Sequence, residues 1–239
     1  MINLVDLRLD LVGAAGQVSI LKGVDLQVPA GSAVSVVGPS GSGKSSLIAV
    51  IAGIERATGG QVVVDGVDLA TLDEDGLSRF RRGRLSILFQ SFHLIPTLSA
   101  LENVAVPLEL MGRRDALTRA ADALAEVGLA HRVDHYPGQM SGGEQQRTAL
   151  ARAIVTEPSI LLADEPTGNL DRANGEHVMD LVFDLRKKLG TTLLLVTHDA
   201  ALAQACDWTC RMEDGRIVTP PDSWSNPSSA GQVLAGAPA

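Results

Sequence analysis

The chain has 239 residues, 45% of them apolar, and 28 acidic residues against 20 lysines and arginines give it a formal net charge of −8. This composition fits a globular protein with a sizeable core, and an acidic chain without a basic stripe is a poor candidate for nonspecific nucleic-acid binding. The longest apolar run, 47–54, is far shorter than the roughly 20 residues that cross a bilayer, and the N-terminus lacks the features of a signal peptide. We therefore expect a cytosolic protein that reaches a membrane only through a partner.

In chain order, the apolar segments predict an α/β fold. The first 30 residues and the segment 60–69 alternate apolar and polar residues and carry turn glycines, which is typical of a smaller antiparallel sheet. Continuous apolar runs at 33–38, 85–89, 159–163 and 191–196 are typical of parallel strands covered by helices on both faces. Residues 100–135 are expected to be mostly helical. Two apolar stripes at helical spacing are Leu117, Ala120, Ala121, Leu124 and Val127, and Val178, Leu181, Val182, Leu185 and Leu189, the second ending at Gly190 as a C-cap.

The composition changes near the C-terminus. From residue 219 the chain is rich in Pro, Ser, Ala and Gly, which predicts a flexible tail at 219–239 after a folded domain at 1–218. The two cysteines, Cys206 and Cys210, are too few for a disulfide scaffold, and their C-x3-C spacing is not a usual zinc or redox motif. We interpret them as reduced structural thiols, with an incidental bridge or metal contact as the alternative.

A glycine- and serine-rich loop, GPSGSGKSS, separates the apolar run at 33–38 from the next apolar segment. It satisfies the phosphate-binding pattern G-x4-G-K-[ST], in which glycines let backbone N–H groups face an anion at the N-terminus of a helix. We expect Lys44 to reach the outer phosphates and the Ser45 hydroxyl to ligate Mg²⁺. A flexible turn that caps a helix is the alternative. The expected nucleotide contacts in the loop are Gly38, Pro39, Ser40, Gly41, Ser42, Gly43, Lys44, Ser45 and Ser46.

Two carboxylates follow the apolar run at 159–163. The carboxyl end of a strand lies beside the phosphate loop in sheets of this kind. We expect Asp164 to hold Mg²⁺ through water and Glu165 to take a proton from an attacking water molecule. Solvated acids at an exposed strand end are the alternative.

The segment MSGGEQQR, 140–147, contains two patterns. Ser141 and Glu144 form an S-x-x-E capping box at the start of a helix predicted over 144–155. The box does not explain Gly142 and Gly143, because each glycine lowers helix propensity by about 1 kcal/mol. A phosphate that approaches the bare backbone at this helix start would explain them.

These motifs, in this order, resemble those of ABC-type ATPases over roughly residues 1–218. MSGGEQQR is similar to the family signature LSGGQ, with Met140 for Leu and Glu144 for Gln. Gln90 resembles the Q-loop glutamine, Asp171 in GNLD the D-loop aspartate, and His198 in VTHD the switch histidine, although a histidine after a strand is more often a plain loop residue. The resemblance implies a P-loop NTPase core with an N-terminal antiparallel β subdomain and a helical signature subdomain at about 91–155. It also implies hydrolysis of ATP with Mg²⁺.

The resemblance further implies a head-to-tail homodimer in which two copies of the chain share each nucleotide. The implied catalytic residues are Glu165, His198, Gln90 and Lys44. The implied Mg²⁺ ligands are Ser45, Gln90 and Asp164. The phosphate loop of one copy would face Ser141, Gly142 and Gly143 of the other, with Asp171 nearby. One position departs from the family pattern, because Leu11 stands where an aromatic residue that stacks on adenine is expected.

The segment 79–104 resembles the lipoprotein-release, macrolide-export and cell-division group of bacterial ABC ATPases. In that group the loop after the Q-loop glutamine receives a cytoplasmic helix of the membrane partner. Phe92, Leu94, Ile95 and Pro96 are the candidate docking residues here, with burial under the helical region as the alternative. The resemblance implies an ATPase subunit, peripheral to the cytoplasmic face of a bacterial inner membrane, that powers a separately encoded transmembrane permease.

Other functions are left open or disfavoured. An ATP-driven mechanical regulator of a membrane protein, without substrate transport, has the same sequence features. A soluble ABC ATPase of DNA repair would carry long coiled coils or zinc modules between the phosphate loop and the signature, but Lys44 and Asp164 are only 120 positions apart (164 − 44) and no heptads or basic patch occur. A P-loop kinase would leave Ser141–Glu144 and Asp171 unexplained.

Overall fold

Two sheets organise the chain, and the helix after the phosphate loop lies between them. The computed structural model describes residues 1–13 and 16–218, so the predicted tail at 219–239 lies outside the described residues. An antiparallel sheet has the strand order β2-β1-β4-β5, with β1 Ile2–Gly13, β2 Gly16–Val28, β4 Gly59–Val64 and β5 Val67–Asp68. A second sheet has the order β10-β9-β3-β8-β7-β6, with β3 Ala33–Val37, β6 Leu85–Phe89, β7 Ile160–Asp164, β8 Thr192–Val196, β9 Trp208–Glu213 and β10 Arg216–Ile217.

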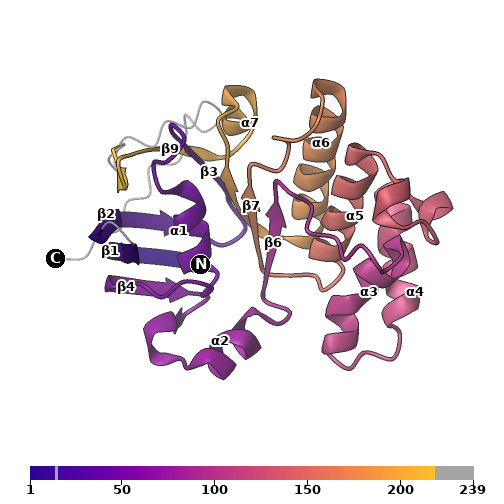
Figure 1. Ribbon diagram of the computed structural model, residues 1–239, viewed down its shortest axis with the longest axis horizontal. Coiled ribbons are helices and arrows are strands. Elements are labelled where there is room, and N and C mark those ends of the chain that lie inside the picture. The colour runs from indigo at the N-terminus through magenta and orange to yellow at the C-terminus, as the bar shows by residue number, and fades with distance from the viewer. Residues whose placement is uncertain (14–15, 219–239) are drawn as a thin grey trace.

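The larger sheet runs through the middle of the molecule, with helices on both of its faces (Figure 1). Its strands β9, β3, β8, β7 and β6 are parallel, and β10 is antiparallel to β9. On one side lie the antiparallel sheet and two helices, and on the other lie most of the remaining helices. The helices are α1 Lys44–Ile51, α2 Glu74–Arg81, α3 Ala100–Leu110, α4 Ala116–Glu126, α5 Gly142–Ile154, α6 Arg172–Leu189 and α7 Ala200–Gln204, with 3-10 turns η1 Leu69–Thr71, η2 Ala130–Arg132 and η3 Pro137–Gln139.

The predicted α/β architecture is confirmed. The run at 85–89 coincides with β6, and the other three continuous runs match β3, β7 and β8 to within one residue. Alternate residues of these strands enter two separate apolar clusters: Leu193 and Leu195 face the helices α3–α6, whereas Leu194 and Val196 face α1 and the antiparallel sheet. Both sets are buried, which is why the sequence of these strands does not alternate.

Two expectations about helices need correction. Leu117 was expected in the buried stripe of the helical segment, but it is 51% exposed. The buried face of α4 is formed instead by Ala116, Ala120, Ala123 and Leu124, because small side chains let α4 pack closely on its neighbours. The helix predicted over 144–155 begins two residues earlier, since its N-cap is Ser141 and the two glycines form its first turn.

The interpretation of the cysteines as reduced structural thiols is confirmed. Cys206 and Cys210 are free and buried, and they lie in different apolar clusters on opposite faces of the larger sheet. Burial raises the pKa of the Cys206 thiol to about 12 and that of the Cys210 thiol to about 11. Among the described residues no group of three or more His, Cys, Asp or Glu side chains could hold a metal ion.

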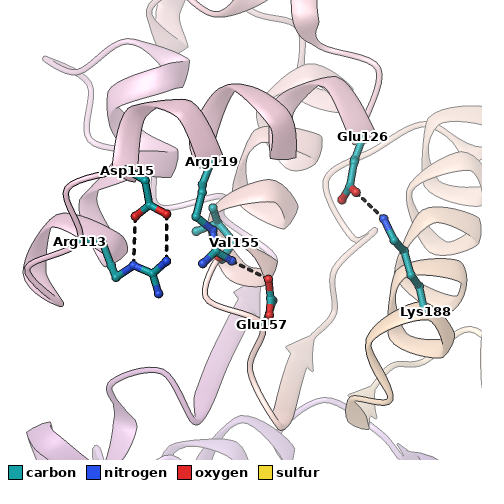
Figure 2. Close-up of polar contacts among 7 residues, drawn as sticks. All are labelled: Arg113, Asp115, Arg119, Glu126, Val155, Glu157 and Lys188. Carbon is teal, nitrogen blue, oxygen red and sulfur yellow. Dashed lines mark hydrogen bonds and ion pairs between the residues drawn. The ribbon is translucent and has the colours of Figure 1, made fainter.

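Ion pairs fasten α4 to the rest of the chain. Figure 2 shows Arg119 of α4 donating to the Glu157 carboxylate, at 2.6 Å, and to the Val155 carbonyl, at 3.2 Å. Lys188 at the end of α6 pairs with Glu126 of α4 at 2.5 Å. These contacts cross a groove of about 260 Å³ between the helices. Exposed pairs of this kind contribute little each, so the apolar packing of α4 on α3 and α5 carries most of the stability.

The capping box of α5 predicts a specific pH dependence of stability. The Glu144 carboxylate accepts a hydrogen bond from the Ser141 backbone N–H and pairs with Arg132, which together hold its pKa at about 2, below the ordinary 4.5. A carboxylate with a lowered pKa in the folded state stabilises the fold above pH 4.5 and loses that contribution as the pH falls towards 2. Wild type should therefore exceed Glu144→Gln in unfolding free energy at pH 7, and the difference should shrink from pH 4.5 downward.

Urea unfolding at a series of pH values measures this difference. Glu109→Gln is the matched control, because Glu109 lies exposed on α3 and has no side-chain partner among the described residues. A difference between wild type and Glu144→Gln that stayed constant from pH 7 to pH 3 would contradict the prediction.

Candidate nucleotide-binding site

The register of the parallel strands brings the motif residues to one edge of the larger sheet. Phe89 pairs with Asp164, Asp164 pairs with Val196, and Val196 pairs with Val36. Gln90, Glu165 and the loop with His198 therefore follow neighbouring strands at the same level, beside the phosphate loop that follows β3. The carboxyl edge of a parallel sheet is where such folds bind ligands.

Backbone contacts shape the phosphate loop. Gly43 has a φ of 102°, a conformation that residues with a side chain rarely adopt, and a Cβ at Gly38 would lie 2.0 Å from the Met212 carbonyl oxygen. No side chain caps the N-terminus of α1, so its free N–H groups face the loop. The Lys44 ammonium donates to the Gly38 and Pro39 carbonyls, each at 2.9 Å, and Lys44 is only 8% exposed. The loop is thus a positively polarised cradle for an anion.

A cleft of about 480 Å³ opens above the loop. Its lining combines the loop with the residues that follow β6, β7 and β8, and it comprises Ile20, Ser40, Gly41, Gly43, Lys44, Ser45, Ser46, Gln90, Glu165 and His198. The predicted catalytic residues Gln90, Glu165 and His198 therefore share one cleft with Lys44. Such a cleft can take a phosphate chain with a reactive carboxylate and an imidazole alongside it.

Asp164 carries an unsatisfied buried oxygen next to Ser45. Its Oδ1 is buried and has no hydrogen-bond partner. Burial raises the pKa of Asp164, as does the neighbouring charge of Glu165, while the hydrogen bond with Ser45 and the charge of Lys44 lower it. A buried carboxylate oxygen beside a hydroxyl fits a small hard cation, and Mg²⁺ typically uses one or two carboxylates plus phosphate oxygens of the substrate.

Glu165 and His198 contact each other directly. His198 Nδ1 lies 2.8 Å from Glu165 Oε2, and because a carboxylate oxygen only accepts, Nδ1 carries the proton in this contact. The backbone of Glu165 has a φ of 47°, and its N–H donates to the Val196 carbonyl at 2.9 Å. A non-glycine residue in this region of φ is strained, and such strain is concentrated at functional sites.

Two residues that the sequence analysis missed hold this arrangement. Asn169 exchanges two hydrogen bonds with Gln90: the Gln90 side chain donates to Asn169 Oδ1 at 3.2 Å, and Asn169 Nδ2 donates to the Gln90 carbonyl at 3.1 Å. Gln146 of α5 is fully buried, and its Nε2 donates to the Phe89 and Pro166 carbonyls. Gln146 is a polar residue at an otherwise apolar position of a helix that packs on the sheet, which was the available signal for it, whereas Asn169 lies in the turn before α6 and carries no such signal.

The signature residues do not line the cleft of their own chain. Ser141 accepts the Glu144 N–H as an N-cap. Packing within the chain explains the glycine at position 143, because a Cβ there would lie 2.7 Å from Asn174 Oδ1. At Gly142 a Cβ would make only ordinary contacts, the nearest at 3.5 Å, so packing does not require a glycine there.

Asp171 also lies outside the cleft. It caps α6, where its Oδ1 accepts the Asn174 N–H at 3.0 Å and its Oδ2 accepts Asn174 Nδ2 at 2.6 Å. These hydrogen bonds lower the pKa of Asp171, and the bond from the Asn174 backbone N–H has the larger effect. Within one chain Asp171 is thus a helix cap that also orients the side chain packed against Gly143.

The structure does not bring Leu11 into the cleft. Leu11 lies opposite Val18 in the β1–β2 ladder and is 41% exposed. The apolar residue that lines the cleft is Ile20 on β2, whose carbonyl would be 3.2 Å from a Cβ at Gly43. Sequence reasoning considered only the first strand, and the pairing of that strand with β2 was the signal for Ile20.

The chain is similar to known proteins over most of its length. Residues 21–168 match the ABC transporter family. The chain is 48% identical over 203 residues to YbbA, an ABC transporter ATP-binding protein of Escherichia coli (strain K12), covering 84% of this chain and 89% of that protein. It is 43% identical over 220 residues to the lipoprotein-releasing system ATP-binding protein LolD of Geobacter metallireducens, covering 91% and 98%. The dimeric post-hydrolysis structure of the ATP-binding cassette MJ0796, bound to ADP and Pi, matches with a TM-score of 0.85 and 37% identity, covering 91% of this chain and 97% of that one.

The buried amide of Gln146 predicts a loss of stability when its donor is removed. In Gln146→Met the volume is nearly kept, but the hydrogen bonds to the carbonyls of Phe89 and Pro166 are lost, and those residues flank Gln90 and Glu165. We expect the free energy of unfolding in urea to fall by about 1–3 kcal/mol. Gln17→Met, at an exposed position of β2, is the control and should change it by less than about 0.5 kcal/mol. Equal midpoints for both variants would contradict the role of Gln146.

Proposed function

This chain belongs to the ABC transporter family, and from that premise we propose that it binds and hydrolyses ATP to power a membrane subunit. The observation that carries the proposal is the cleft in which the Lys44 loop and the N-terminus of α1 face Gln90, Glu165 and His198. In this proposal residues 1–218 form the ATPase domain and about 91–155 its helical subdomain.

Binding is proposed to begin at the phosphate loop. The backbone N–H groups at the start of α1 and the Lys44 ammonium offer hydrogen bonds and positive charge to the β- and γ-phosphates. Ile20 also lines the cleft, and its apolar side chain suits contact with the base or the ribose. Leu11, the position expected to contact adenine, is exposed on the adjoining β1–β2 hairpin and does not line the cleft.

The residues proposed to hold Mg²⁺ are Ser45, Asp164 and Gln90. The buried unsatisfied Oδ1 of Asp164 beside the Ser45 hydroxyl supports this assignment. When bound, Mg²⁺ neutralises the charge that the phosphate oxygens carry. Gln90 is kept in reach of the cleft by its two hydrogen bonds to Asn169.

Hydrolysis is proposed to use Glu165 as the general base. A water molecule attacks the γ-phosphorus while a Glu165 carboxylate oxygen accepts its proton, the bond from phosphorus to the β,γ-bridging oxygen breaks, and ADP and phosphate result. The hydrogen bond with His198 Nδ1 fixes the carboxylate in the cleft. His198 and Lys44 are proposed to stabilise the negative charge of the phosphoryl group during transfer.

A second copy of the chain is proposed to complete the site. Ser141, Gly142 and Gly143 lie outside the cleft of their own chain, and Gly142 has no packing reason to lack a side chain. A γ-phosphate of the partner copy at the start of α5 would explain it. The dimeric form of the related cassette MJ0796 supports this arrangement.

The loop after Gln90 is proposed to bind the membrane subunit. Phe92 and Leu94 are half-buried and pack on the helical core, whereas Ile95 and Pro96 are exposed and free for contact. The buried Asn103 side chain fixes the loop through four hydrogen bonds to its backbone and to the start of α3. A loop that is already ordered loses less conformational freedom when a partner binds it.

The similarity to LolD, which spans 98% of that protein, supports an export or lipoprotein-release type of complex with a separately encoded permease at the bacterial inner membrane. Within the described residues no helix has the length and apolar character needed to cross a bilayer. No feature of the structure favours a mechanical regulator over a transporter, because the two differ in the partner.

Glu165→Gln tests the proposed chemistry. The substitution keeps the shape of the side chain and removes the proton acceptor, so kcat for ATP hydrolysis should fall by about 10²–10⁴ while the affinity for ATP stays within a fewfold of wild type. A phosphate-release assay and nucleotide titration measure the two quantities. Glu176→Gln, on the exposed surface of α6, is the control. Normal turnover by Glu165→Gln would remove Glu165 from the role of base.

A pair of alanine substitutions tests the shared site. Gly142→Ala should fold with unchanged or slightly higher stability, because the Cβ has room and alanine favours a helix by up to about 1 kcal/mol, but ATP-dependent dimerisation and hydrolysis should fall at least tenfold. Gly143→Ala should instead lose about 1–3 kcal/mol of stability through its clash with Asn174. Urea unfolding, light scattering with ATP and phosphate release distinguish the two. Full activity of Gly142→Ala would refute the shared site.

A further inference from the structure

A patch of arginines and exposed apolar side chains lies outside the nucleotide cleft. We call it the basic–apolar patch, and it consists of Arg79, Arg82, Arg84, Leu110, Met111 and Arg114. None of these residues lines the cleft or belongs to the proposed docking loop. The sequence shows no long basic stripe, but the fold adds the apolar end of α3 to the arginine-rich stretch 79–84.

The two parts of the patch are in contact. A Cβ at Gly83, in the turn between α2 and β6, would lie 3.1 Å from Met111 Cε at the end of α3. In Figure 1, α2 and the loop that joins α3 to α4 both lie along the lower side of the molecule. Met111 at the end of α3 thus lies against the turn that carries Arg82 and Arg84.

The arginines of the patch are largely free of acidic partners. Arg82 and Arg114 are exposed, and within residues 1–13 and 16–218 neither side chain has an ion pair or hydrogen bond. Arg79 and Arg84 approach carboxylates only at 4.0 Å. By contrast, Arg113 is bound by both oxygens of Asp115, at 3.0 and 2.9 Å (Figure 2). The patch therefore carries unpaired positive charge on a chain whose net charge is −8.

The apolar residues protrude beside that charge. Leu110 is 68% exposed and Met111 is 37% exposed at the C-terminal end of α3. A leucine that protrudes at a helix end can enter the boundary between lipid headgroups and acyl chains. Arginines around it attract anionic headgroups.

We propose that the basic–apolar patch rests on an anionic phospholipid surface. Leu110 and Met111 enter the interface, and Arg82, Arg114 and their neighbours contact the headgroup phosphates. In this proposal α3 joins two membrane-facing features. The loop after Gln90 is hydrogen-bonded to the first half of α3 through Asn103. The patch lies at the other end of this 11-residue helix, which is about 15 Å long. The inference rests on the proposed function only for the choice of a membrane as the occupant.

Co-sedimentation of the full chain with vesicles tests the proposal. Wild type should bind phosphatidylcholine vesicles that contain phosphatidylglycerol, should bind pure phosphatidylcholine much more weakly, and should lose binding at high salt. Arg82→Glu should weaken binding to the anionic vesicles by about 10- to 30-fold, and Leu110→Ser by about tenfold. Lys187→Glu makes the same charge change on the exposed surface of α6 and should change binding by less than about twofold.

Each of the following results bears on the lipid contact, on the proposed function or on the folding of the variants. ATP hydrolysis without vesicles should be the same in wild type, Arg82→Glu and Lys187→Glu, which shows that the variants fold. Wild type that hydrolyses ATP but stays in the supernatant with anionic vesicles at low salt overturns the lipid contact and leaves the proposed function standing. Loss of the copurifying membrane protein in Arg82→Glu, without vesicle binding by wild type, overturns it in favour of a protein partner. If wild type binds anionic vesicles but hydrolyses no ATP, the lipid contact of the patch is supported and the proposed ATPase function is contradicted.

Discussion

The hydrogen-bonded register of β3, β8, β7 and β6 is the constraint on which the rest of the site depends. Val36, Val196, Asp164 and Phe89 stand side by side across four strands, so the residues that follow them emerge at one level. A shift of one residue in any of these pairings would turn the apolar side chains of that strand to the wrong faces. Because both faces are filled by separate apolar clusters, the core that stabilises the sheet also fixes where the chemistry can occur.

Side-chain hydrogen bonds from outside the sheet refine this arrangement. Gln146 reaches from α5 to the backbone before Gln90 and after Glu165, and Asn169 holds Gln90 itself. Asn174 packs against Gly143 while it is bound by Asp171. The start of α5, the segment after β6 and the N-terminus of α6 are therefore joined by direct side-chain contacts.

Much of this was predictable from the sequence, and the limits have physical causes. Continuous apolar runs specify buried strands, and the phosphate loop, the carboxylates after β7 and the capping box at Ser141 are local patterns that need no tertiary information. Leu117 was misplaced because alanines and leucines at similar spacing describe two possible helix faces, and only packing on α3 and α5 selects one. Ile20 and Gln146 were missed because their roles arise from contacts between segments far apart in the chain.

The state of the two cysteines has a practical consequence. A thiol that is buried and has a pKa of about 11 or 12 is almost entirely protonated at neutral pH and out of reach of reagents, and the sequence contains only these two. A maleimide reagent should therefore label the unaltered polypeptide very little. A single cysteine introduced at Ile95 or Leu110 would carry the whole signal, so spectroscopic probes can follow the loop after Gln90 or the C-terminal end of α3 without removal of either native thiol.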